Sequence, residues 1–300
     1  MPESEPLGPT VAGMLSAARL DPAAVVRLIE LAIDEDLDGG VDVTTVATVP
    51  VDQTAILDLV ARRAGVVAGI PVAAAVFMIV CENDDVIIDF VAQDGDVVEA
   101  GDVLLSVQST THALLQAERP ALNFLSHLSG IATATNAWVQ AVRGTGAAIR
   151  DTRKTTPGFR ALEKYAVRCG GGVNHRMSLS DAALVKDNHV LAAGGVAQAF
   201  ALVRAQFPGV PVEVEVDSLE QLDEVVEAGA DLVLLDNFSV AETSEAVRRT
   251  NGRARLEASG GLTLDVAHEV AKTGVDYLAV GALTHSAPVL DIGADLRQAD

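Results

Sequence analysis

The chain has 300 residues, of which 49% are hydrophobic and only 3% aromatic, and its formal net charge is −21 at pH 7. A chain with this much negative charge repels nucleic acid and acidic membranes. With so few aromatic side chains, it also lacks a surface on which the bases of single-stranded nucleic acid could stack. We therefore expect neither partner, and we expect any bound anion to meet a local reversal of charge.

The cysteines and the N-terminus favour a cytoplasmic protein. Cys81 and Cys169 have no spacing typical of a metal site or of a disulfide framework, so we expect reduced thiols. Glu3 and Glu5 stand where a secretory signal carries bases. The apolar runs stop short of the roughly 20 residues that a membrane span needs.

The first part of the chain predicts a flexible arm over residues 1–20 and then an α/β sandwich domain over residues 21–125. Asp21 and Pro22 suit the start of a helix that runs to residue 32. Short β-branched runs between turn signals, with an apolar helix near residues 72–80, predict a half-open sheet. The expected strands are 55–61, 86–91 and 103–107. We expect residues 288–300 to return to this domain.

Residues 94–107 are similar to the hairpins of biotinyl and lipoyl carrier domains. A carrier needs a modifiable lysine at the tip of this hairpin, whereas no lysine precedes Lys154. We therefore interpret the likeness as structural only, and expect an open sandwich with a lipoyl-like hairpin.

Residues 126–287 predict an α/β barrel. A helix is expected over residues 121–142, with Pro120 at its first turn. After it, strands and helices alternate, which predicts parallel strands with right-handed crossovers. The expected strands are 147–152, 183–187, 211–216, 231–237, 255–261 and 275–281. Because a closed barrel has eight such units, we predict an incomplete parallel barrel of about six or seven strands.

The carboxyl ends of barrel strands face the active site. Along the chain these ends carry bases, then acids, then small residues: Arg153, Lys154, Lys186, Glu215, Asp236, Ser259, Gly260, Gly261, Gly281 and Ala282. The last glycines are either plain turns or a phosphate site built from backbone N–H groups.

A basic cluster lies at residues 150–186, which contain eight Lys and Arg residues but only three Asp and Glu residues. We interpret Arg160, Lys164 and Arg168 as solvated charges on a helix. The bases nearest the strand ends are Arg153, Lys154, His175, Arg176 and Lys186. Because guanidinium groups match carboxylates and phosphates, these bases predict a small substrate with several negative charges.

Glu213 and Glu215 alternate in VEVEV and therefore share one face of their strand. A carboxylate inside a barrel needs a partner or a function. Glu215 either pairs with Lys186 or, with Asp236, accepts sugar hydroxyls or holds Mg²⁺ through water.

Several motifs together resemble the quinolinate phosphoribosyltransferase family, and the resemblance covers nearly the whole chain beyond about residue 20. They are DTRKTTPGFR (151–160), GGGVNHR (170–176) and LVKDNH (184–189), with AERPALN (117–123), VEVEV (212–216), LLDN (234–237), EASGG (257–261) and VGALTHS (280–286). The resemblance implies a type II phosphoribosyltransferase, in which an α/β sandwich precedes the incomplete barrel. It implies transfer of phosphoribose from phosphoribosyl pyrophosphate (PRPP) to quinolinate. The products would be CO₂, pyrophosphate and nicotinate mononucleotide for NAD synthesis.

The family's pattern also implies roles for the matched residues. The quinolinate carboxylates would lie among Arg119, Arg153, His175, Arg176 and Lys186. Lys154, Lys186, Glu215 and Asp236 would be the catalytic residues; of these, Lys154, Glu215 and Asp236 would hold PRPP, with Mg²⁺ bound at Glu215 and Asp236 through water and PRPP. The 5′-phosphate would lie against Ser259, Gly260, Gly261, Val280, Gly281 and Ala282, with His285 nearby, and Thr152 would also bind substrate. Arg119 would reach the partner's site in a homodimer, and further assembly stays open.

Two alternatives remain at this point. One is a related superfamily member, either nicotinate-using or the molybdenum-associated homologue. Such an enzyme would need fewer bases than Arg119, Arg153, His175 and Arg176. The other is a barrel lyase that forms a Schiff base at Lys186, which requires a lowered pKa at that lysine.

Overall fold

The computed structural model describes residues 7–81 and 86–299. The chain divides into two units: Met1–Ala134, Ala161–Gly170 and Ala287–Asp300 form the first, and Thr135–Arg160 and Gly171–Ser286 form the second. The boundary thus falls later than residue 125. The helix α6 (Arg160–Cys169) lies almost entirely in the first unit, although the sequence places it within the barrel domain.

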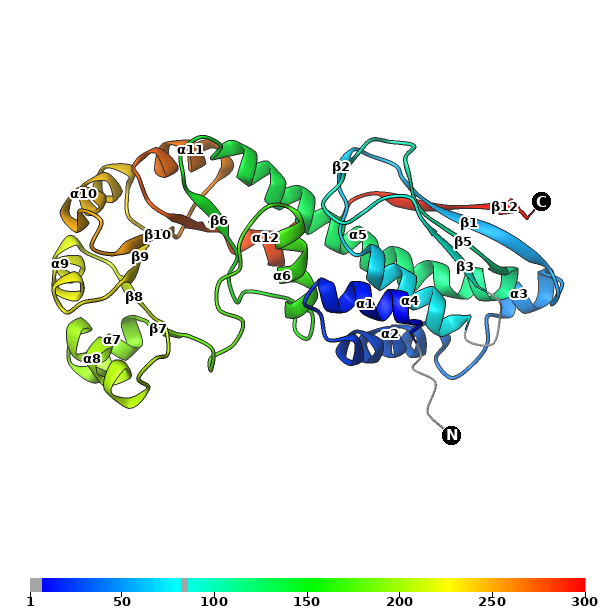
Figure 1. The fold of residues 1–300 in the computed structure, drawn as a ribbon, viewed down its shortest axis with the longest axis horizontal. Coiled ribbons are helices and arrows are strands. Elements are labelled where there is room, and N and C mark those ends of the chain that lie inside the picture. Colours follow the sequence, from blue (N-terminus) through cyan, green and yellow to red (C-terminus); the bar gives the residue numbers. More distant parts are fainter. Residues whose placement is uncertain (1–6, 82–85, 300) are drawn as a thin grey trace. The chain divides into compact units, whose positions relative to one another are not determined.

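The first unit is built on a four-stranded antiparallel sheet (Figure 1). Its order is β12 (Ile292–Gln298), β1 (Thr54–Ala61), β5 (Val103–Thr110) and β3 (Ile87–Phe90). The C-terminal strand β12 pairs with β1, so the end of the chain completes the sheet that the N-terminal part begins. The strands β2 (Gly65–Val66) and β4 (Val97–Val98) form a separate ladder at the hairpin that resembles a lipoyl domain.

The helices of this unit are α1 (Pro9–Ala17), α2 (Pro22–Leu37), α3 (Val43–Thr48), α4 (Ile70–Val80), part of α5 (Thr111–Ala141) and α6. The prediction of a flexible arm over residues 1–20 is wrong for residues 7–20, which are described and contain the helix α1. Val11 and Leu15, one helical turn apart in α1, are both buried, and apolar residues at this spacing dock a helix. Residues 1–6 lie outside the described residues.

The long helix α5 contains Pro120 in its interior instead of beginning after it. Proline removes one backbone hydrogen bond from a helix. Burial of Leu114, Ala117 and Ala121 on the same helix offsets that loss, because apolar area removed from water stabilises by about 25 cal/mol per Å². None of the described helices, α5 included, has both the length and the apolarity needed to cross a membrane.

The second unit contains six parallel strands, which confirms the predicted incomplete barrel. Their order is β6 (Ala148–Arg150), β11 (Tyr277–Ala279), β10 (Arg255–Ser259), β9 (Leu232–Asp236), β8 (Val212–Val216) and β7 (Ala183–Val185). A single parallel bridge from Arg150 to Val173 extends the β6 edge. Figure 1 shows the helices outside this curved row of strands. They are α7 (Asp187–Ala193), α8 (Val196–Gln206), α9 (Leu219–Glu227), α10 (Val240–Thr250), α11 (Leu264–Lys272) and α12 (Ala282–His285).

Candidate active site

A cavity of about 510 Å³ lies at the carboxyl ends of the parallel strands in the second unit. It brings together most of the residues that the sequence singles out: Thr152, Arg153, Lys154, His175, Arg176, Lys186, Glu215, Asp236, Ser259 and Gly260. These residues follow or end five different strands, so the parallel topology gathers side chains that are far apart in the sequence.

A smaller cavity of about 160 Å³ shares part of its wall with the first. It is lined by the remaining predicted residues of this unit, Gly261, Val280, Gly281, Ala282 and His285. Lys154 lines both cavities, and its side chain lies against Gly281, where a Cβ would come within 3.1 Å of Lys154 Cδ. Thr284 donates a hydrogen bond of 2.8 Å to the Lys154 carbonyl and so anchors this loop.

The backbone between the two cavities depends on Gly260 and Asn237. Gly260 has a φ of +90°, and a Cβ there would collide with the Asn237 side chain. Asn237 has a φ of +58°, and its N–H donates to the Ser259 carbonyl at 2.8 Å. Its Nδ2 also donates to Asp236 Oδ2 at 2.9 Å. Asn237, which lines the larger cavity and was not predicted, therefore orients the Asp236 carboxylate.

The bases in the cavity form an electropositive group. The Nε of Arg153 is buried and has no hydrogen-bond partner among the described residues. Burial, and then the charge of neighbouring Arg153, lower the pKa of Arg176 below its ordinary value. A buried donor without an acceptor is costly, and an anionic ligand would supply that acceptor.

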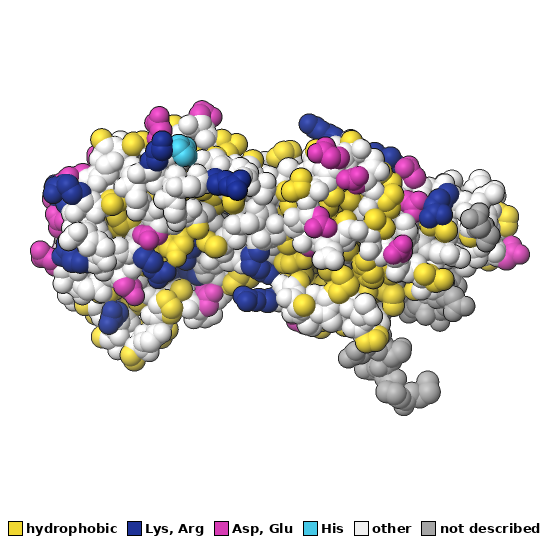
Figure 2. Space-filling model, turned by 45° about the horizontal axis from the view of Figure 1, so that its top comes forward, with side chains coloured by type: hydrophobic (Ala, Val, Ile, Leu, Met, Phe, Trp, Pro, Cys, Tyr) yellow, Lys and Arg dark blue, Asp and Glu magenta, His cyan; other side chains and the backbone are white. Residues whose placement is uncertain are grey.

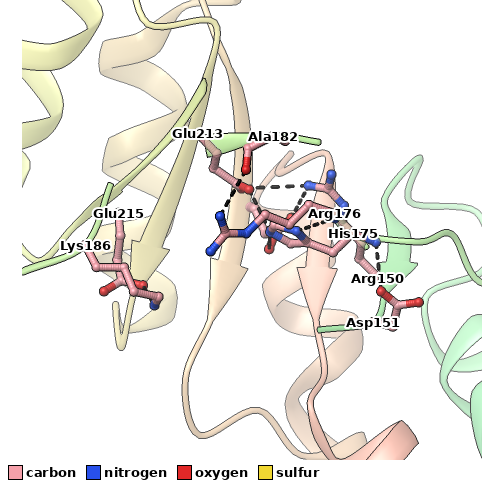
Figure 3. Close-up of polar contacts among 9 residues, drawn as sticks. Arg150, Asp151, His175, Arg176, Ala182, Lys186, Glu213 and Glu215 are labelled. Carbon is pink, nitrogen blue, oxygen red and sulfur yellow. Dashed lines mark hydrogen bonds and ion pairs between the residues drawn. The ribbon is translucent and has the colours of Figure 1, made fainter. Parts of the chain in front are cut away.

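The acids Glu215 and Asp236 both line the cavity. Lys186 Nζ forms an ion pair with Glu215 Oε2, so the salt bridge considered from the sequence is present (Figure 3). Magnesium is usually bound by one or two carboxylates together with substrate phosphates and water. Two carboxylates on an open cavity fit this donor set.

A second charged cluster adjoins the cavity through His175 and Glu257, which line it, and was missed from the sequence. Arg150 Nη1 lies 2.5 Å from Glu257 Oε2 and 3.7 Å from Glu213 Oε1, and His175 Nε2 lies 2.7 Å from Glu213 Oε2. The ligand atoms of His175, Glu213 and Glu257 are close enough to hold a metal ion. The guanidinium of Arg150 already pairs with both carboxyl groups, and it would repel a cation. The cluster is therefore an ion-pair network.

Burial, and after it the charge of Glu213, raise the pKa of Glu257 to about 8, although the Arg150 guanidinium acts in the opposite direction. With an ordinary value of 4.5, this carboxyl group retains a proton in the folded chain that the unfolded chain releases. Its contribution to stability is complete below pH 4.5, declines as the pH rises to about 8, and is constant above that.

Glu257→Gln should therefore flatten the pH dependence of stability. The free energy of unfolding in urea, measured from about pH 5 to about pH 9, should fall more steeply in the parent than in the variant. The difference in slope should approach at most about 1.4 kcal/mol per pH unit. Parallel curves for the two proteins would show that Glu257 does not hold this proton.

Two bases considered in the sequence analysis, Arg119 and Lys164, line neither cavity. Arg119 is on the part of α5 that belongs to the first unit, its side chain is 61% exposed, and it is not among the described residues that line either cavity. Lys164, interpreted as a solvated charge, is instead fully buried in α6. The amphipathic period of α6 does not reveal which of its charged residues face inward.

The chain is similar to known proteins along almost its whole length. Residues 42–129 match the model of the quinolinate phosphoribosyl transferase N-terminal domain, and residues 131–295 match that of the C-terminal domain. A nicotinate-nucleotide pyrophosphorylase [carboxylating] from Mycobacterium leprae is 54% identical over 94% of this chain and 100% of its own. A quinolinate phosphoribosyltransferase [decarboxylating] from Nicotiana tabacum is 39% identical over 88% of this chain and 80% of its own. The crystal structure of NadC from Streptococcus pyogenes is 40% identical, with a TM-score of 0.89 over 94% of this chain and 99% of that one.

Proposed function

The chain belongs to the quinolinate phosphoribosyltransferase family, and from this premise we propose which of its residues bind quinolinate and which bind PRPP. The enzyme is a nicotinate-nucleotide pyrophosphorylase (carboxylating), which transfers phosphoribose from PRPP to quinolinate with decarboxylation, in NAD biosynthesis. The Schiff-base lyase and the other superfamily members are therefore not retained as hypotheses.

Quinolinate binds in the larger cavity, with its carboxylates at Arg153, Arg176 and Lys186 and its ring beside His175. The observation that carries this placement is the buried Arg153 Nε, which has no acceptor among the described residues. Each charge-assisted hydrogen bond to such a group contributes about 1.5–3 kcal/mol where water is excluded. Two carboxylates on adjacent ring atoms match a site with several bases close together.

PRPP lies across both cavities, beside Lys154. Its 5′-phosphate occupies the smaller cavity, against the backbone of Ser259, Gly260, Gly261, Val280, Gly281 and Ala282, near Thr152 and His285. Support comes from the three glycines at these positions, which leave backbone groups accessible, and from the shared wall of the two cavities. Glu215 and Asp236 orient the ribose and would hold Mg²⁺ through water and the pyrophosphate group.

The roles of the residues follow from how charge moves during the reaction. Breaking the bond to pyrophosphate leaves positive charge on the ribose and negative charge on the leaving group, where the Lys154 ammonium stabilises it. Bound magnesium would neutralise more of the pyrophosphate charge. The quinolinate nitrogen attacks with its own lone pair and needs no base. The electron pair of the broken bond to CO₂ stays on C2, where the adjacent pyridinium nitrogen stabilises it, and a proton from water then bonds to C2 to give nicotinate mononucleotide.

We further propose a cytoplasmic homodimer in which Arg119 reaches the quinolinate site of the partner. Arg119 is exposed and absent from the cavity walls within its own chain. Exposed aliphatic side chains of the first unit, such as Leu31, Val43 and Val51, suit a subunit contact, and Figure 2 shows hydrophobic side chains gathered on this unit. Two cysteines 88 positions apart, Cys81 and Cys169, with no spacing typical of a disulfide framework, suit a reducing compartment.

Quinolinate labelled with ¹⁴C in the 2-carboxylate tests the reaction and its metal together. With PRPP and Mg²⁺ the enzyme should release ¹⁴CO₂ and form an equal amount of nicotinate mononucleotide. Chelation with EDTA should reduce the rate at least about 100-fold, because metal ions supply several kcal/mol of charge stabilisation to such transfers. Readdition of Mg²⁺ should restore it. Full activity in EDTA would contradict the magnesium proposal and leave the reaction intact.

A further inference from the structure

Next to the larger cavity lies a set of charges, Arg150, Glu213 and Glu257, to which the proposed mechanism gives no role. Glu213 on β8 is 3% exposed and Glu257 on β10 is 0% exposed. Burying two carboxylates this close together is unfavourable unless other groups neutralise and position them. Arg150 on β6 forms ion pairs with both, and Glu213 also contacts His175 (Figure 3).

The hydrogen bonds of His175 define the state of its ring. The backbone N–H of Arg176 donates to His175 Nδ1 at 2.6 Å, so Nδ1 carries no proton. The ring proton is then on Nε2, which donates to Glu213 Oε2 at 2.7 Å. In this arrangement the imidazole joins strand β8 to the peptide group that carries Arg176.

Further contacts hold the same segment. Asp151 Oδ1 accepts the His175 backbone N–H at 2.8 Å, and Asp151 Oδ2 accepts from Asn174 Nδ2 at 2.5 Å. Arg176 Nη1 donates to the Ala182 carbonyl at 3.0 Å. The peptide before Arg176 is therefore tied to strand β8 through the His175 ring and to the segment after β6 through Asp151.

We propose that Glu213 is a positioning residue for quinolinate recognition: through the His175 ring it fixes the direction in which Arg176 presents its guanidinium to a substrate carboxylate. This inference rests on the proposed role of Arg176 in the quinolinate site. A misplacement of about 1 Å in a binding group can cost about 100-fold in catalysis, so a group that never touches substrate can control affinity.

Two conservative substitutions separate positioning from charge balance. Glu213→Gln keeps an oxygen that can accept a hydrogen bond from His175 Nε2 but removes the negative charge. Glu213→Asp keeps the charge beside Arg150 but withdraws the oxygen from His175. Positioning predicts that Glu213→Asp raises the KM for quinolinate about 10-fold or more, that Glu213→Gln raises it less than about threefold, and that neither shifts the KM for PRPP more than about twofold. If Glu213→Gln is the worse variant, or both KM values rise together, the proposal is overturned.

The pair between His127 Nε2 and Glu163 Oε1, at 2.9 Å, is a matched control. Glu163 is also fully buried, but it lies in the first unit and lines neither cavity. Glu163→Asp and Glu163→Gln should alter the thermal unfolding temperature and leave the KM for quinolinate within about twofold. If a Glu163 variant raised the KM for quinolinate as much as Glu213→Asp does, the effect would belong to buried carboxylates in general, and the proposal would be refuted.

A double mutant provides the second readout. In an Arg176→Ala background, Glu213→Asp should cause no further rise in the KM for quinolinate, because the group it positions is gone. Additive effects would refute the coupling. The proposed function fails on a different observation: if Arg176→Ala alone leaves the KM for quinolinate unchanged, the placement of the substrate is wrong, whatever Glu213 does.

Discussion

Lys154→Ala should lower kcat by about 10²–10³ at saturating concentrations of both substrates, the loss typical when one group that stabilises developing charge is removed. Lys154 lines both cavities and belongs to none of the ion pairs among the described residues. Its ammonium can therefore meet the pyrophosphate group as negative charge develops there. Pyrophosphate release measures kcat, and Lys154→Arg, which keeps a positive charge, should recover part of the rate. Retention of kcat within about threefold in Lys154→Ala would remove this residue from the mechanism.

Lys154→Ala, combined with Arg119→Ala, also tests the proposed homodimer. If the proposed homodimer is right, Arg119→Ala should also be nearly inactive, because it would remove a base from the partner's quinolinate site. When equal amounts of the two variants are unfolded and refolded together, half of the dimers should be mixed, with one intact site in each. Activity should then rise to about one quarter of the parent value. If the mixture stays inactive, Arg119 acts within its own chain or not at all.

Arg153→Ala should abolish most of the discrimination between quinolinate and nicotinate. When a substrate group accepts hydrogen bonds from the buried donors of a site, an analogue without that group leaves those donors unpaired. The site then discriminates against the analogue by about 10⁴ in kcat/KM. The buried Nε of Arg153 is such a donor. Its removal should lower kcat/KM for quinolinate about 10³-fold or more and change the already poor value for nicotinate little.

Arg160→Ala is the control for this measurement. Arg160 belongs to the same basic cluster, but its Nε donates to Thr155 at 3.1 Å, its Nη1 donates to the Met177 carbonyl at 3.0 Å, and it does not line the cavity. It should keep the preference for quinolinate. If the parent enzyme uses nicotinate as well as quinolinate, the site does not recognise the second carboxylate, and the assignment of Arg153 is wrong.

The barrel and its strand ends can be predicted from the sequence because both follow from local patterns. Short aliphatic strands alternate with amphipathic helices, and parallel strands place their last residues at one rim. Lys154, Glu215 and Asp236 were placed on this basis, and all three line the cavity. The resemblance to a family added the chemistry, since strand ends alone did not distinguish a phosphate site from turns.

The charged cluster of Arg150, His175, Glu213 and Glu257 depends on contacts between distant segments. Arg150 and Glu257 are 107 positions apart, and nothing in the local pattern of either strand pairs them. The VEVEV alternation places Glu213 and Glu215 on one face, but it does not show that Glu213 meets His175 and Glu215 meets Lys186. The buried helix α1 was missed for another reason, since Pro, Ser and Glu around it concealed the spacing of Val11 and Leu15.

The open row of parallel strands has a consequence for the solubility of the folded chain. Within the described residues, β6 and β7 are the outermost strands of this sheet, and each is only three residues long. Unpaired edges are templates on which a foreign strand can add, and long, flat ones promote aggregation. Edges this short offer an intruding chain few hydrogen bonds. The unclosed ring of strands therefore presents few free backbone groups on which a foreign strand could add.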